Sequence, residues 1–114
     1  MTEKEGCEIL RRCFTEAGLV IQDGYPLDAE GIVVNLDGFD PARRVGYEYI
    51  TTEAGDRADV TPDVVAALDE RMEKGDLFVL LIDEEDVRDE ASLRKAAARF
   101  LEIVGHKAAR GALS

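Results

Sequence analysis

The sequence predicts a single α/β domain of the α+β kind, with a mixed four-stranded sheet and packed helices in the order α-β-β-β-α-β-α. Three observations predict this fold: apolar residues at helical spacing in three separate segments, short β-branched runs between the first two helices, and an unbroken apolar run at 77–82. At 114 residues, 46% of them apolar and 34% charged, the chain can bury one hydrophobic core. We therefore expect one globular domain over 1–114, with 106–114 as a frayed tail.

The first helix is predicted at the N-terminus. Thr2 and Glu5 have the spacing of a capping box, in which the hydroxyl and the carboxylate each accept a hydrogen bond from a free backbone amide. Gly18 is a natural C-terminal stop. One apolar helical stripe lies between them, formed by Leu10, Cys13, Phe14 and Ala17.

Three strands are predicted next. Residues 19–22 form a short β-branched run that the turn pair Asp23-Gly24 closes, and Pro26 makes the next segment an edge strand or a loop. Residues 32–37 and 45–51 are rich in β-branched and aromatic residues and flank a proline-containing turn at 40–43. These two segments predict an antiparallel hairpin.

The second half of the chain predicts a helix, a strand and a helix. Thr61 at the N-cap and Pro62 at the first helical position begin the helix, and Gly75 ends it. The apolar run at 77–82 does not alternate, which is typical of a strand that is covered on both faces and lies inside the sheet. The last helix starts near Asp89 and is expected to end at Gly105 or to fray beyond it.

Charge is the strongest compositional signal. The net charge of −11 comes from 25 acidic against 14 basic residues. Such a field repels phosphate backbones and anionic membranes, which argues against nucleic acid and membrane partners and favours a basic protein partner. The acidity can equally serve solubility. Because no apolar run reaches bilayer length and the N-terminus is polar, we expect a cytoplasmic protein.

The cysteine and histidine content excludes two common frameworks. Cys7 and Cys13 are six residues apart on one predicted helix, so their side chains lie on different faces and cannot form a disulfide with each other. With His106 as the only histidine, a zinc site of the usual kind cannot be built either.

Two acidic residues on the predicted hairpin carry a resemblance to a known family. Asp37 falls at the end of the second strand and Glu48 inside the third. With the α-β-β-β-α-β order, this arrangement resembles the restriction-endonuclease-like PD-(D/E)xK superfamily. The resemblance implies that the two acids hold Mg²⁺ or Mn²⁺ in a nuclease or phosphodiesterase. The chain departs from the motif at Ile50, where the family has lysine, and at Leu36, where it has proline.

Each of these acids also has a structural interpretation. Asp37 precedes a glycine and suits a turn that accepts backbone hydrogen bonds, and Glu48 suits a surface strand paired with Arg43 or Arg44. The acidic run at 83–86 comes after the last strand, where a sheet tends to place a ligand, and is interpreted either as a hard-cation site or as a solvated loop.

The sequence therefore leaves two functions open. The first is a non-catalytic protein-interaction module that needs no cofactor, with Tyr47 and Tyr49 on one strand face pointing either into the core or toward a partner. The partner is then a basic protein or a second copy of the chain. The alternative is the metal-dependent nuclease or phosphodiesterase, active or inactive. The sequence alone does not decide whether the protein is an enzyme.

Overall fold

The structure is a computed structural model that describes residues 2–29, 31–51 and 60–113, and the side chains among them except at 29 and 108–113. The predicted element order is confirmed. The elements are α1 (Glu3–Glu16), β1 (Gln22–Ala29), β2 (Ile32–Asp40), β3 (Val45–Ile50), α3 (Pro62–Lys74), β4 (Phe78–Asp83), the 3₁₀ turn η1 (Glu84–Asp86) and α4 (Glu90–Leu113).

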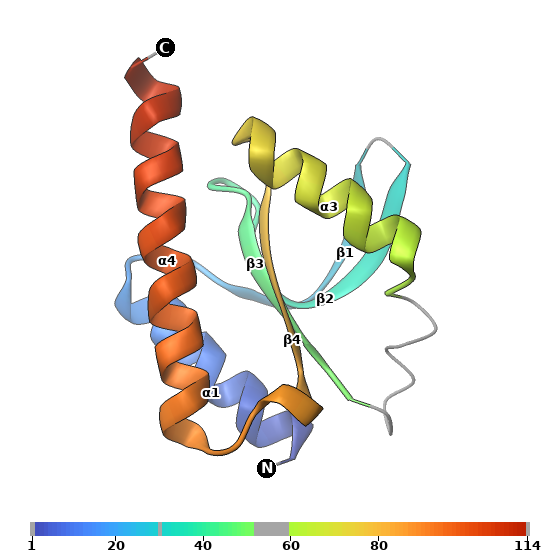
Figure 1. Cartoon of the computed structure of the whole chain (residues 1–114), viewed down its shortest axis with the longest axis vertical. Coiled ribbons are helices and arrows are strands. Elements are labelled where there is room, and N and C mark those ends of the chain that lie inside the picture. The colour runs from blue at the N-terminus through green and yellow to red at the C-terminus, as the bar shows by residue number, and fades with distance from the viewer. Residues whose placement is uncertain (1, 30, 52–59, 114) are drawn as a thin grey trace.

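The four strands form one mixed sheet between two helical layers. The strand order is β1-β2-β3-β4, antiparallel for the first two pairs and parallel between β3 and β4. Helices α1 and α4 cover one face and α3 covers the other, as Figure 1 shows. The larger core cluster lies under α1 and α4 and includes Leu10, Phe14, Tyr47, Tyr49, Leu93 and Phe100. The second lies under α3 and includes Val34, Leu36, Phe39, Leu68 and Val79.

The predicted helix starts are confirmed. The Thr2 hydroxyl accepts a hydrogen bond from Glu5 N at 3.1 Å, and both halves of the capping box are present. Helix α3 begins at the Thr61 cap and ends at Gly75. The φ of Gly75 is 77°, a left-handed conformation that glycine adopts without steric strain because it has no Cβ. Ala17 does not belong to the buried stripe of α1, because it lies at the exposed C-cap.

The first strand differs from the prediction. Residues 19–21 are not a strand, and Asp23-Gly24 is not a hairpin turn but part of β1. Gly24 has a φ of 57°, so it bends the strand where the turn was expected. Pro26 pairs with Asn35 on β2, and because β1 is an edge strand the missing N–H of proline leaves no gap in the sheet.

The hairpin of β2 and β3 is confirmed, with β2 longer than expected. It continues through Gly38 to Asp40. Gly38 pairs with Tyr47, whose ring occupies the space that a Cβ at Gly38 would take. The chain then turns over Pro41–Arg44 into β3.

The last two elements also correct the sequence interpretation. Strand β4 is covered on both faces, but it lies at the edge of the sheet rather than inside it. Its apolar run reflects two helical layers and not two neighbouring strands. Helix α4 remains helical past Gly105 to Leu113, so an end at Gly105 is wrong, and the fraying beyond Gly105 stays a prediction. Within the described ranges, no helix combines the length and apolar composition needed to cross a membrane.

Candidate functional site

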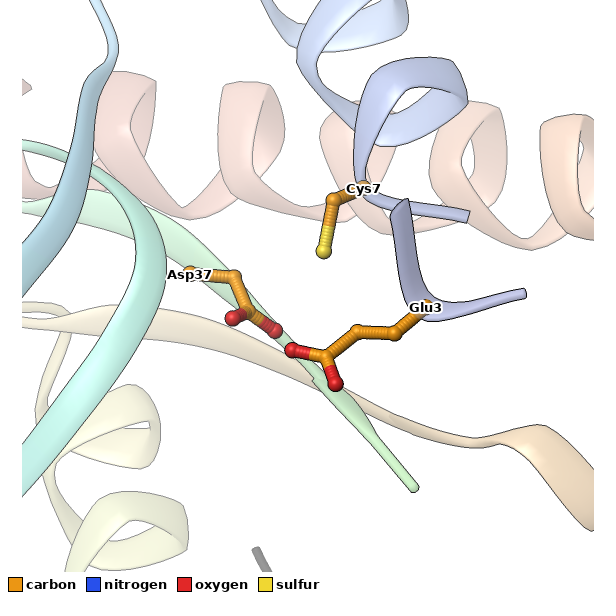
Figure 2. Close-up of side chains that lie close together, drawn as sticks. All are labelled: Glu3, Cys7 and Asp37. Carbon is orange, nitrogen blue, oxygen red and sulfur yellow. The ribbon is translucent and has the colours of Figure 1, made fainter. Parts of the chain in front are cut away.

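Three potential ligand side chains meet where α1 begins. Glu3 and Cys7 are four residues apart and therefore share one face of α1. They point toward Asp37 on β2, as Figure 2 shows, and one ligand atom from each residue lies within 4.8 Å of the others. All three residues are half-buried. We call this group the Glu3–Cys7–Asp37 cluster.

Asp37 lies next to the point where the backbone pairing of β2 and β3 ends. The β2–β3 pairing runs from Asp40–Val45 to Gly38–Tyr47. Beyond it, Tyr49 N donates a 2.7 Å hydrogen bond to Asp37 Oδ2. The side chain thus takes the place of a backbone acceptor, which leaves Asp37 held firmly but with one oxygen directed toward α1.

Close packing of α1 on the sheet brings Glu3 and Cys7 next to Asp37. A Cβ on Gly6 would lie 2.9 Å from the Tyr49 ring, so only glycine allows the helix to approach this closely. The capping box fixes where the helix starts and therefore where Glu3 lies. Thr51 Oγ1, just after β3, donates to Glu3 Oε2 at 3.1 Å.

The local electrostatics keep the thiol protonated. Burial raises the pKa of Cys7 above its ordinary value. The charge of Asp37, a hydrogen bond to Asp37, and the charges of Glu3 and Glu48 raise that pKa further. The thiol therefore acts as a hydrogen-bond donor to the carboxylate at neutral pH. A cation that used Cys7 as a ligand would have to displace this proton.

The structure brings Asp37 together with Glu3, an acid that the sequence analysis did not name. Glu48 does not belong to the Glu3–Cys7–Asp37 cluster. It is 3% exposed on β3, so the interpretation as a surface-strand residue is wrong, and Arg43 pairs with Asp40 instead. Asp37 is a strand residue rather than a turn acid. The predicted Asp37–Glu48 metal pair stays a prediction.

Tyr47 and Tyr49 point into the core. Each is 1% exposed, and the Tyr47 ring packs edge-on against Phe14 with centroids 4.9 Å apart. Of the two orientations that the sequence allowed, the structure has the inward one, so neither side chain can serve as an exposed anchor for a partner.

More carboxylates surround the cluster at the ends of β3 and β4. The pKa of Tyr49 is raised first by burial and then by Glu84, Cys7, Asp83 and Glu5. Acids from α1, β2, β4 and η1 thus gather at one end of the molecule, where parallel strands end and ligands often bind. We call this surface the acidic end and define it by Glu3, Glu5, Asp37, Asp83 and the η1 residues Glu84–Asp86.

A hollow of about 320 Å³ adjoins the cluster. It is lined by acidic, basic and thiol side chains: Lys4, Cys7, Glu8, Arg11, Asp23 and Asp37. Lys4 therefore lies near the carboxylates, whereas the strand position that carries lysine in the PD-(D/E)xK motif is Ile50 here.

Sequence reasoning found Asp37 but missed Glu3 and treated Cys7 as unremarkable. The available signal was the four-residue spacing of Glu3 and Cys7 on α1. That spacing alone did not indicate which strand the helix face would meet. The chain matches no protein-family model, and comparisons with curated proteins and with solved structures gave no match.

Proposed function

We propose that this protein is a non-catalytic, cytoplasmic protein-interaction module that binds a basic protein partner through its acidic end. The observation that carries the proposal is the convergence of acids from α1, β4 and η1 near the buried Tyr49 phenol, beside Asp37 of β2, which accepts the Tyr49 N–H. A concentrated negative field of this kind speeds association with a basic partner and makes it sensitive to salt.

The chemistry of the cluster supports binding rather than catalysis. One oxygen of Asp37 already accepts the Tyr49 N–H, and the raised pKa of Cys7 leaves little thiolate to act as a nucleophile. The strand lysine of the nuclease motif is replaced by Ile50.

A fluorescent oligolysine peptide tests the proposal directly. Neutralising η1 with Glu84→Gln, Glu85→Gln and Asp86→Asn removes three charges from the acidic end. A matched control removes three exposed charges elsewhere with Asp28→Asn, Asp69→Asn and Glu73→Gln. If each pair at the acidic end contributes about 0.5 kcal/mol, the η1 variant should bind roughly tenfold more weakly and the control should bind like the wild type. Equal weakening in both variants would show that only net charge matters, and the proposal would then be wrong.

A second candidate function rests on the Glu3–Cys7–Asp37 cluster. Two carboxylates and a thiol within 4.8 Å suit a divalent cation, and the observed element order contains the α-β-β-β-α-β order of the PD-(D/E)xK superfamily. On this proposal the protein binds Mg²⁺, Mn²⁺ or Zn²⁺ and is an active or inactive relative of metal-dependent nucleases.

Thermal melts with each cation distinguish the two functions. A cation that binds only the folded state raises the melting temperature. Glu3→Gln and Asp37→Asn should abolish that rise if the cluster is the site, whereas Glu48→Gln should abolish it only if the predicted strand pair contributes. A rise would justify testing the cleavage of plasmid DNA. No rise with any cation would exclude the second function.

A further inference from the structure

We propose that the groove between β4 and α4 binds a free alkyl carboxylate, with the alkyl chain along its apolar wall and the carboxylate at Lys95 and Arg99. This inference goes beyond the acidic-end function and uses none of the residues that define the acidic end.

The groove lies along one side of α4, where the helix passes β4 in Figure 1. It encloses about 430 Å³, at the lower end of the roughly 300–1,000 Å³ that is typical of small-molecule sites. Spread over the roughly 17 Å of helix between Ser92 and Ile103, this volume is about 6 Å wide. A helix with its side chains is about 10–12 Å across, so the groove suits a single extended chain better than a docked helix.

A small residue keeps the groove open. Ala96 lies on the same side of α4 as Phe100 and Ile103, and the three residues line the groove with Leu80 of β4. The methyl group of Ala96 leaves room that a larger side chain would fill. Ile103 is 45% exposed, so the apolar wall is open to solvent. An alkyl chain in the groove would cover this wall and be stabilised by the apolar area removed from water.

Two cationic side chains stand at the groove without an anionic partner. Lys95 and Arg99 both line it, and within the described residues neither makes an ion pair or a side-chain hydrogen bond. Their spacing of four residues puts two like charges side by side on α4, which is unfavourable by itself. The neighbouring Arg94 has the opposite arrangement, because Glu90 pairs with it at 2.9 Å. A bound anion would relieve the repulsion between Lys95 and Arg99.

The charges around the groove favour a singly charged carboxylate. Glu90 and Glu102 flank the two bases on α4, but in the part of the chain that the structure describes neither acid lines the groove. An arginine can hold both oxygens of a carboxylate, and a lysine adds a second positive charge. The net charge of −11 opposes every negative charge that approaches, so it repels a monoanion less than a phosphate dianion. The same field repels an anionic membrane, which favours a ligand that is free in solution.

An NMR titration of the isotope-labelled protein with octanoate tests the proposal. In the wild type the amide signals of Leu80, Ala96 and Ile103 should shift with one saturable affinity, and the signal of the distant Val33 should not. Ala96→Leu should weaken binding at least tenfold, because the larger side chain fills the groove while helix propensity is kept. Ala98→Leu, at an exposed position of α4 outside the groove, is the matched control and should bind like the wild type.

The charged part of the site is tested by Lys95→Gln and Arg99→Gln, which also serve if Ala96→Leu fails to fold. Each should weaken octanoate binding about threefold and leave the binding of uncharged 1-octanol unchanged. Arg12→Gln, which removes an exposed arginine from α1, should change neither affinity.

Three outcomes overturn the proposal. The first is a wild type in which octanoate causes no shifts, or shifts away from the groove. The second is unweakened binding in a folded Ala96→Leu variant. The third is an equal loss in Arg99→Gln and Arg12→Gln, which would mean that only net charge matters. The oligolysine assay is read separately, so each of these failures leaves the acidic-end function tested on its own.

Discussion

Replacement of the buried Asp40 should destabilise the fold strongly. It is 1% exposed, and its two oxygens accept four hydrogen bonds. Oδ1 accepts from the backbone N–H groups of Ala42 and Arg43, each at 3.0 Å. Oδ2 accepts from Val20 N and from the Arg43 guanidinium, each at 2.9 Å. This carboxylate ties the end of α1, the β2–β3 turn and the sheet together.

The magnitude of Asp40→Asn can be worked out from this geometry. Whichever way the amide is oriented, its NH₂ group faces two donors, so two charge-assisted hydrogen bonds are lost at about 1.5–3 kcal/mol each. The guanidinium of Arg43 is 55% exposed, and its share is reduced by solvent screening. We therefore expect a loss of about 3 kcal/mol, out of the roughly 5–15 kcal/mol that stabilise a domain.

Urea unfolding measures this loss. With a denaturant slope of about 1.5 kcal/mol/M, the midpoint of Asp40→Asn should fall by roughly 2 M. Arg43→Gln removes only the half-exposed ion pair and should cost no more than about 1 kcal/mol. A loss below about 1 kcal/mol in Asp40→Asn, or equal losses in the two variants, would refute the reasoning.

The pKa of Asp40 determines the direction in which the stability of the fold changes with pH. Burial alone would raise the pKa of Asp40, but hydrogen bonds from Val20 N, Arg43 N, the Arg43 guanidinium and Ala42 N outweigh it, and the net pKa is lowered. Its contribution is therefore complete above the unfolded-state pKa of about 3.9 and is lost as the pH falls through the folded-state pKa. Asp40→Asn should flatten this acid limb of the stability profile.

Three further variants or measurements test local features. At pH 8 the Cys7 thiol should react with iodoacetamide more slowly than free cysteine, because burial and neighbouring carboxylates raise its pKa. Mass spectrometry measures the rate, with Cys13 as the internal comparison, and a fast reaction of Cys7 would contradict the electrostatics of the site. Arg44→Gly should stabilise the fold by about 1 kcal/mol in urea titrations, since Arg44 has a φ of 60°, and a loss of stability would show that its side chain matters more than its backbone. Gly38→Ala should cost about 2 kcal/mol because the new methyl group meets the Tyr47 ring; a neutral thermal melt would mean that the ring moves aside.

The sequence predicted the elements better than their neighbours in space. Helix caps such as Thr2 and Thr61 are local signals and were correct. The edge position of β4 was not predictable from residues 77–82, since an apolar run reports that both faces are covered and does not report what lies beside the strand. In the same way, Asp23-Gly24 has turn composition, but the pairing of β1 with β2 overrides it.

The candidate site was half predicted for a similar reason. Asp37 stands out in the sequence because it ends an alternating strand, but Glu3, the acid that joins it in the cluster, comes from a helix that is distant in the chain. Glu3 becomes part of the cluster only because Gly6 lets α1 approach the Tyr49 ring. Contacts between residues that are far apart in the chain produce no periodic pattern in the sequence, so a single sequence could not predict them.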